Sequence, residues 1–90
     1  MGTTIQKAEK FRIILGNTDR SAAELISYLR RHAPDLTGIH IEQAPLKSAQ
    51  IGEVALDFHV PDGKMLPSQL NAILAQASEC MYQVENIERI

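Results

Sequence analysis

EVALDFHV, residues 53–60, is the stretch that indicates the fold most directly. Its valines, leucine and phenylalanine alternate with glutamate, alanine, aspartate and histidine, so apolar residues recur at every second position. Successive side chains of a β-strand point to opposite faces, and the pattern therefore predicts a strand with one buried and one mostly wet face. Pro61-Asp62-Gly63, a sequence typical of a turn, ends the strand.

An earlier segment has the same two-residue period. Phe11, Ile13 and Leu15 alternate with Arg12, while Ile14 interrupts the polar half of the pattern. Apolar residues on both faces are typical of a strand with neighbours on both sides. We therefore expect a central strand here.

Two helices are predicted from apolar residues that recur at steps of three and four. The first begins after Ser21, which has Glu24 three residues later as in a capping box, and ends before Pro34. The second has Pro67 in its first turn. The two apolar stripes are Ala22, Leu25, Ile26, Leu29 and Ala33 in the first helix, and Leu66, Leu70, Ile73, Leu74, Ala77 and Met81 in the second.

Two further strands complete the fold. Ile39 and Ile41 alternate with His40 and Glu42, and residues 84–90 form a last apolar and polar alternation. The order is βαββαβ, which predicts an α+β, ferredoxin-like sandwich: a four-stranded antiparallel sheet with two helices on one face. The first and third strands are expected in the centre. With 90 residues, the chain has room for one domain, expected over residues 10–90 after a flexible tail over residues 1–9.

The pairing of the second and third strands has three possible registers. One register places His40 opposite His59, but it also places Glu42 opposite Asp57, which is a repulsive pair. Shifts by two residues place Glu42 opposite His59, or His40 opposite Asp57. Opposite charges across strands contribute about 0.2–1 kcal/mol, so the two shifted registers are favoured.

Composition limits the classes of function. The net charge is −2 with both signs interspersed, which does not favour nucleic-acid binding or a polybasic membrane anchor. The longest apolar run is far below the ~20 residues that cross a bilayer, and no secretory leader is recognisable, so no membrane insertion is expected. Cys80 is the single cysteine, which excludes an internal disulfide. We expect a soluble protein of the reducing cytoplasm.

The sequence has no recognisable catalytic residues or cofactor-binding motif. Cys80 lies near the end of the predicted second helix, a poor place for a nucleophilic thiolate, and is interpreted as a half-buried packing residue. The five glycines match no nucleotide-binding fingerprint. The wet face of residues 53–60 carries acidic groups and no ring for base stacking except histidine, which argues against RNA binding. We therefore expect neither an enzyme nor a cofactor.

Four residues are candidates for metal binding. His40, Glu42, Asp57 and His59 are expected on the helix-free face of the sheet, and imidazole with carboxylate can bind zinc. The chain has no close ligand pair such as His-x-x-x-His. A solvated polar sheet face is the preferred interpretation, and no metal site is predicted.

The loop before the first helix is the remaining candidate. Free backbone N–H groups and the positive end of the helix dipole can hold a carboxylate or another anion. Asn17, Thr18, Asp19 and Ser21 are the candidate ligand-binding residues. A capped helix start without a ligand is the alternative interpretation.

The chain resembles ACT domains, which are small regulatory modules of amino-acid biosynthetic enzymes and stringent-response synthetases. The resemblance runs from about residue 11 to residue 90, and its carriers are Phe11-Arg12-Ile13-Ile14-Leu15, Asn17-Thr18-Asp19-Arg20-Ser21-Ala22, Gly38-Ile39-His40-Ile41 and Val84-x-x-Ile87-x-Arg89-Ile90. Where the family typically has Asp-Arg-Pro-Gly, this chain has Ser21-Ala22 in place of Pro-Gly, and Ala22 adds a Cβ to the loop.

The resemblance implies a regulatory function. It implies a homo-oligomer, in the simplest case a dimer, that binds an amino acid or another small effector at the seam near residues 17–21. The alternative is a protein-interaction or oligomerisation module without a small ligand. Whether the domain is freestanding or serves a larger parent or partner protein stays open at this point.

Overall fold

A computed structural model describes residues 9–45, 52–61 and 65–90. In chain order the elements are β1 (Glu9–Gly16), α1 (Ala22–His32), the 3-10 helix η1 (Pro34–Leu36), β2 (His40–Gln43), β3 (Val54–Val60), α2 (Pro67–Ala77) and β4 (Gln83–Arg89). Residues 1–8 of the expected tail, and Asp62 and Gly63 of the expected turn, lie outside the described residues. The last residue assigned to the tail, Glu9, is the first residue of β1.

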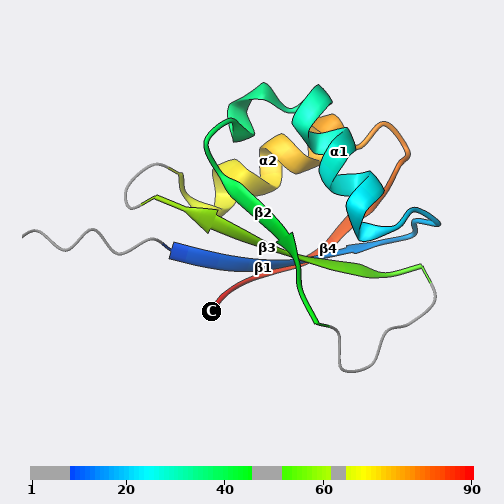
Figure 1. Ribbon diagram of the computed structural model, residues 1–90, viewed down its shortest axis with the longest axis horizontal. Helices are drawn as coiled ribbons and strands as arrows, with labels where there is room; N and C mark the ends of the chain where they lie inside the picture. The colour runs from blue at the N-terminus through cyan, green and yellow to red at the C-terminus, as the bar shows by residue number, and fades with distance from the viewer. Residues whose placement is uncertain (1–8, 46–51, 62–64) are drawn as a thin grey trace, which may run out of the picture.

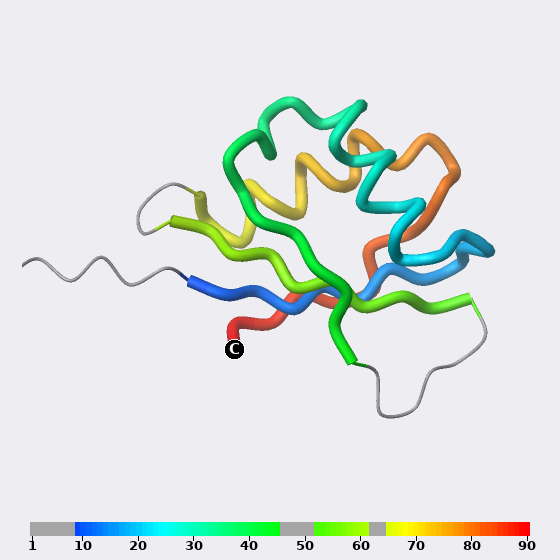
Figure 2. The backbone as a smooth tube through the Cα atoms, viewed as in Figure 1, coloured from blue at the N-terminus to red at the C-terminus, as the bar shows by residue number. Residues whose placement is uncertain are grey.

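The four strands form one antiparallel sheet in the order β2-β3-β1-β4. β1 and β3 are central and β2 and β4 are edges, as the sequence predicts. Both helices cover the same face of this sheet and leave the other face open (Figure 1). The backbone leaves the sheet for the helix layer after β1 and again after β3 (Figure 2). The architecture is therefore α+β, with two layers.

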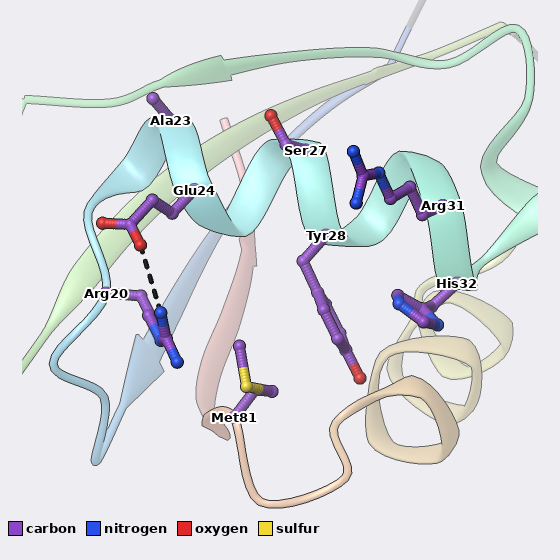
Figure 3. Close-up of a pocket in the computed structure, with 8 residues that line it drawn as sticks. All are labelled: Arg20, Ala23, Glu24, Ser27, Tyr28, Arg31, His32 and Met81. Atoms are coloured by element: carbon purple, nitrogen blue, oxygen red, sulfur yellow. Dashed lines mark hydrogen bonds and ion pairs between the residues drawn. The ribbon is translucent and has the colours of Figure 1, made fainter.

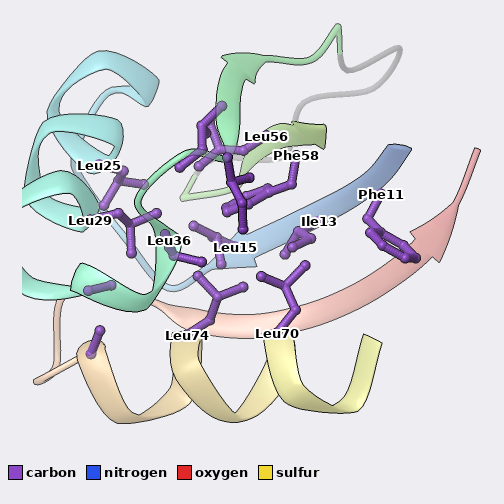
Figure 4. Close-up of a cluster of buried hydrophobic side chains, with 14 of the residues drawn as sticks. Phe11, Ile13, Leu15, Leu25, Leu29, Leu36, Leu56, Phe58, Leu70 and Leu74 are labelled. Carbon is purple, nitrogen blue, oxygen red and sulfur yellow. The ribbon is translucent and has the colours of Figure 1, made fainter. Parts of the chain in front are cut away.

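The core lies between the sheet and the two helices (Figure 4). Alternate residues of the central strands face the helices, so the period-two pattern becomes one apolar surface. The helices close this surface with residues three and four positions apart. The largest fully buried core side chains are Phe11, Ile13, Leu15, Leu25, Leu29, Leu36, Ile39, Leu56, Phe58, Val60, Leu70 and Leu74.

The predicted start of α1 is confirmed in its hydrogen bonds. The Ser21 hydroxyl accepts the backbone N–H of Glu24 at 3.2 Å, and the Glu24 carboxylate accepts the backbone N–H of Ser21 at 3.3 Å. This reciprocal pair satisfies two donors that the first helical turn would otherwise leave free.

Neither α1 nor α2 is long and apolar enough to cross a membrane, and the same holds for every helix among the described residues.

The end of α2 differs from the prediction. The apolar stripe continues to Met81, but the helix ends at Ala77. Glu79 and Cys80 follow with positive φ angles of 39° and 66°, a left-handed conformation that terminates a helix. Cys80 is exposed rather than half-buried, since it lies in this turn and not on the buried face of α2.

The favoured registers of β2 and β3 are wrong. His40 lies opposite His59, and Glu42 lies opposite Asp57. The repulsion is relieved because the Asp57 carboxylate accepts hydrogen bonds from Arg12 of β1 at 2.9 and 3.2 Å. Glu42 in turn directs its carboxylate toward the two histidines. The predicted registers took only β2 and β3 into account. The observed register is possible because Arg12 of β1 supplies the positive charge that Asp57 needs.

Candidate functional site

Two hydrogen bonds of Thr18 fix the predicted ligand loop, one within the loop and one to Gly52. The Thr18 hydroxyl accepts the backbone N–H of Arg20 at 3.1 Å, and the Thr18 backbone N–H donates to the Gly52 carbonyl at 3.1 Å. Thr18 is buried, whereas Asn17 has a positive φ of 54° and is exposed. The Asp19 side chain is 98% exposed. The loop therefore presents Asn17 and Asp19 to solvent and uses Thr18 for structure.

The start of α1 carries negative charge of its own. Hydrogen bonds from the backbone and hydroxyl of Ser21, together with one from Arg20, lower the pKa of Glu24. The Glu24 carboxylate therefore stays ionised at the end of the helix where an anion would bind. Ser21 lines a hollow of about 450 Å³ beside the adjoining ends of β2 and β3. The four predicted residues thus have different environments rather than one shared cavity.

A groove runs along the exposed side of α1 and is closed by the turn after α2 (Figure 3). We call it the α1 groove; its volume is about 390 Å³. Its wall is partly built by Tyr28, whose ring stacks on His32 with centroids 4.5 Å apart and whose hydroxyl donates to the Ala77 carbonyl. The lining residues are Arg20, Ala23, Glu24, Ser27, Tyr28, Arg31, His32 and Met81.

The charges of the α1 groove are not all compensated. Arg20 forms an ion pair with Glu24 at 3.3 Å. Arg31 has no ion-pair partner in the part of the chain that the structure describes. The groove is therefore lined by the Arg31 guanidinium, the Ser27 hydroxyl and the apolar side chain of Met81. A small molecule with a carboxylate and an apolar part would match this arrangement.

Sequence reasoning missed the α1 groove for a physical reason. Arg20, Glu24, Ser27 and Arg31 follow a helical spacing, which alone is typical of a solvated helix face. The groove exists because the left-handed turn after α2 carries Met81 to the same place (Figure 3). No local signal in the sequence marked this turn.

The open face of the sheet holds a second group of polar residues. Glu42 lies between two imidazoles: its Oε1 is 3.1 Å from His59 Nε2, and its Oε2 is 3.4 Å from His40 Nε2. Hydrogen bonds with His59 and His40 lower the pKa of the Glu42 carboxyl. The expected cluster on the helix-free face is therefore present for these three residues.

Asp57, the fourth member of the expected cluster, is directed away from the other three. Its side chain is 3% exposed, with Arg12 Nε at 2.9 Å and Lys10 Nζ at 3.5 Å. Burial alone would raise the pKa of Asp57, but the hydrogen bonds and charges of Arg12 and Lys10 outweigh it and lower the pKa. Asp57 is thus an ionised, neutralised residue of the sheet.

Comparisons with known proteins identify no family for this chain. No protein-family model, no curated protein and no solved structure matches it. Its function must therefore follow from its side chains and surfaces.

Proposed function

We propose that this chain is a regulatory, ACT-like module of the ferredoxin-like type, which senses a small carboxylate-bearing effector such as an amino acid in the α1 groove. The observation that carries the proposal is Arg31, an arginine without an ion-pair partner in the described part of the chain, on a groove of about 390 Å³. Sites for small molecules usually measure about 300–1,000 Å³. The two-layer architecture, with two helices on an antiparallel sheet, is compatible with the proposed fold.

The groove suits a carboxylate with an apolar part. The planar guanidinium of Arg31 can bind a carboxylate through two parallel hydrogen bonds. Glu24, two helical turns earlier, is already paired with Arg20 at 3.3 Å. Met81 and the Tyr28 ring supply apolar contact for a side chain. An amino acid has both a carboxylate and, in most cases, an apolar part.

The predicted loop has a supporting role in this proposal. Thr18 fixes the backbone at Arg20 through its hydroxyl, and Arg20 lines the groove. Ser21 caps the start of α1 through Glu24, while Asn17 and Asp19 stay exposed. The effector itself contacts α1 and the turn that carries Met81.

Binding without catalysis fits the groove better than a reaction. Ser27 and His32 both line it, but no hydrogen bond links the Ser27 hydroxyl to the His32 ring within this groove. The His32 ring instead stacks on Tyr28. A serine nucleophile needs an adjacent base, and this pair does not provide one.

The proposal predicts a stabilising effector whose binding depends on Arg31. Thermal unfolding and calorimetry with each of the twenty standard amino acids should identify at least one that binds. At a concentration 100-fold above its Kd, that ligand should stabilise the fold by about 2.7 kcal/mol. Arg31→Met should weaken binding by about tenfold or more, because a hydrogen bond to a charged group contributes about 1.5–3 kcal/mol.

Arg30→Met is the matched control, because Arg30 is an exposed arginine of α1 that does not line the groove. It should leave the affinity unchanged. If no amino acid stabilises the protein, or if the two variants lose the same affinity, the sensing function is wrong.

A second candidate function is self-association through β4. This edge strand has seven residues, against four in β2. Antiparallel pairing with a second copy, with Ile87 opposite its own counterpart, would bring Arg89 toward residue 85 twice, the residue at which a bulge interrupts the pairing of β4 with β1. Arg89 now contacts Glu9 at 3.5 Å, and exchanging one exposed ion pair for another costs little.

Light scattering and sedimentation at high micromolar concentration test this pairing. A dimer is expected, and Glu85→Arg should convert it to a monomer because like charges would then lie opposite each other. Glu53→Arg, which makes the same charge change away from β4, should leave the dimer intact. A wild-type chain that stays monomeric would remove this alternative.

A further inference from the structure

We propose that His40, Glu42 and His59 form a binding site for a divalent transition-metal ion of the zinc type on the open face of the sheet. The site is separate from the α1 groove, since the helices cover the opposite face (Figure 1). The ligands would be the Nε2 atoms of the two imidazoles and one carboxylate oxygen. All three residue types are ordinary zinc ligands.

The strand ladder places the three residues together. His40 and His59 are direct partners in the pairing of β2 with β3, and their ring centroids are 5.3 Å apart. Glu42 lies two residues beyond His40 and therefore on the same face of the sheet. Two hydrogen-bonded strands fix the backbone of all three residues, so a metal ion would have to order side chains only.

The distances fit the size of a tetrahedral site. A Zn–N or Zn–O bond of about 2.0–2.2 Å implies ligand atoms about 3.3–3.6 Å apart in a tetrahedron. In the structure each imidazole contacts a different oxygen of Glu42: Oε1 lies 3.1 Å from His59 Nε2, and Oε2 lies 3.4 Å from His40 Nε2. No two of the three ligand atoms are more than 4.8 Å apart. Small rotations of exposed side chains would complete the geometry.

The surrounding charges leave Glu42 available to a cation. Lys10 lies beside His59 in the sheet and Arg12 beside Asp57; both pair with Asp57, at 3.5 and 2.9 Å, and its single negative charge offsets one of their two positive charges. Glu42 has no lysine or arginine within ion-pair distance among the described residues. Its partners are two imidazoles, which are themselves metal ligands.

Solvent can reach the site. The side chains of His40, Glu42 and His59 are 67%, 46% and 34% exposed. Three protein ligands would leave the fourth position of a tetrahedral ion to water, whereas structural zinc sites use four protein ligands. We therefore expect reversible binding of the ion rather than a structural site needed for folding.

Calorimetric titration of the full chain with Zn²⁺ at pH 7.5 should show one ion bound per chain. Co²⁺ should give the intense visible absorption of a tetrahedral site. Loss of a residue that only hydrogen-bonds to a metal ligand usually weakens metal binding about 10- to 100-fold. Loss of a ligand itself should cost at least as much, so His40→Ala, His59→Ala and Glu42→Gln should each lower the affinity by about 100-fold or more. The exposed positions of these side chains should leave the far-ultraviolet circular dichroism of the variants unchanged.

His32→Ala and Cys80→Ser are the controls, since they remove the other histidine and the thiol of the chain. Both should retain the affinity for Zn²⁺. At pH 5.5 the affinity should fall, because an imidazole must be deprotonated to bind a metal ion. Absence of saturable Zn²⁺ binding, binding that survives in the double variant His40→Ala/His59→Ala, or loss of binding in either control would overturn the site.

Discussion

Phe58→Ala is expected to lower the free energy of unfolding by about 3–5 kcal/mol. The Phe58 side chain is fully buried in the central strand β3, where it lies opposite Phe11 of β1 and Ile41 of β2. Its removal leaves a cavity that three fixed strands cannot fill. At about 0.05–0.15 kcal/mol per residue, the whole chain has about 4–14 kcal/mol of stability, so the loss is a large fraction.

Urea unfolding followed by circular dichroism measures the effect. Phe58→Leu keeps most of the side-chain volume and should lose about 1–2 kcal/mol, which gives a value even if the alanine variant does not fold. Leu66→Ala is the control, because Leu66 is 62% exposed and removes little surface from water. Equal losses at positions 58 and 66 would contradict the core described for this sheet.

The burial of Phe58 is an example of what local pattern can predict. Alternation over residues 53–60 gives the strand to within one residue of β3 (Val54–Val60), since a two-residue period has one structural meaning over that length. The start of α1 could be predicted equally well, because Ser21 and Glu24 are only three residues apart and bind each other. Signals of this kind act within one element.

Features that depend on unusual backbone conformation could not be predicted. The residues after Ala77 continue the helical spacing as far as Met81, and nothing in their side chains marks a stop. Glu79 and Cys80 adopt the left-handed region without the glycine that usually signals it. The exposure of Cys80 and the closing of the α1 groove by Met81 follow from that turn, so both escaped prediction.

The register of β2 on β3 shows a different limit. Comparing Glu42 with Asp57 alone favours a shifted pairing, and that reasoning holds for two isolated strands. In the sheet, Asp57 also faces Arg12, which is 45 positions away in the sequence. The candidate metal site depends on this distant contact, because only the observed register places His40 beside His59.

Arg12→Met should therefore destabilise the fold through Asp57. The substitution removes both hydrogen bonds from a carboxylate whose side chain is 3% exposed, and leaves Lys10 at 3.5 Å as its cation. A buried acceptor without its partner costs about 1–3 kcal/mol, and a charged one costs more, so we expect a loss of about 2 kcal/mol at pH 7 from the Asp57 carboxylate. Arg20→Met is the control, because the exposed pair of Arg20 with Glu24 is screened by solvent and should change the stability little.

The same variant should invert the pH dependence that Asp57 contributes. In the wild type the folded-state pKa of Asp57 is lowered, so its stabilisation is present above the unfolded value of about 3.9 and is lost as the pH falls through the folded-state pKa. Without Arg12, burial is opposed by Lys10 alone, at 3.5 Å, and we expect it to raise the pKa of Asp57 above about 3.9. Stability is then greatest at low pH and falls as the pH rises through the new value. Urea unfolding between pH 3 and pH 6, with each protein compared to its Asp57→Asn counterpart, isolates this contribution; slopes of the same sign in both backgrounds would show that Arg12 does not hold Asp57 in its ionised form.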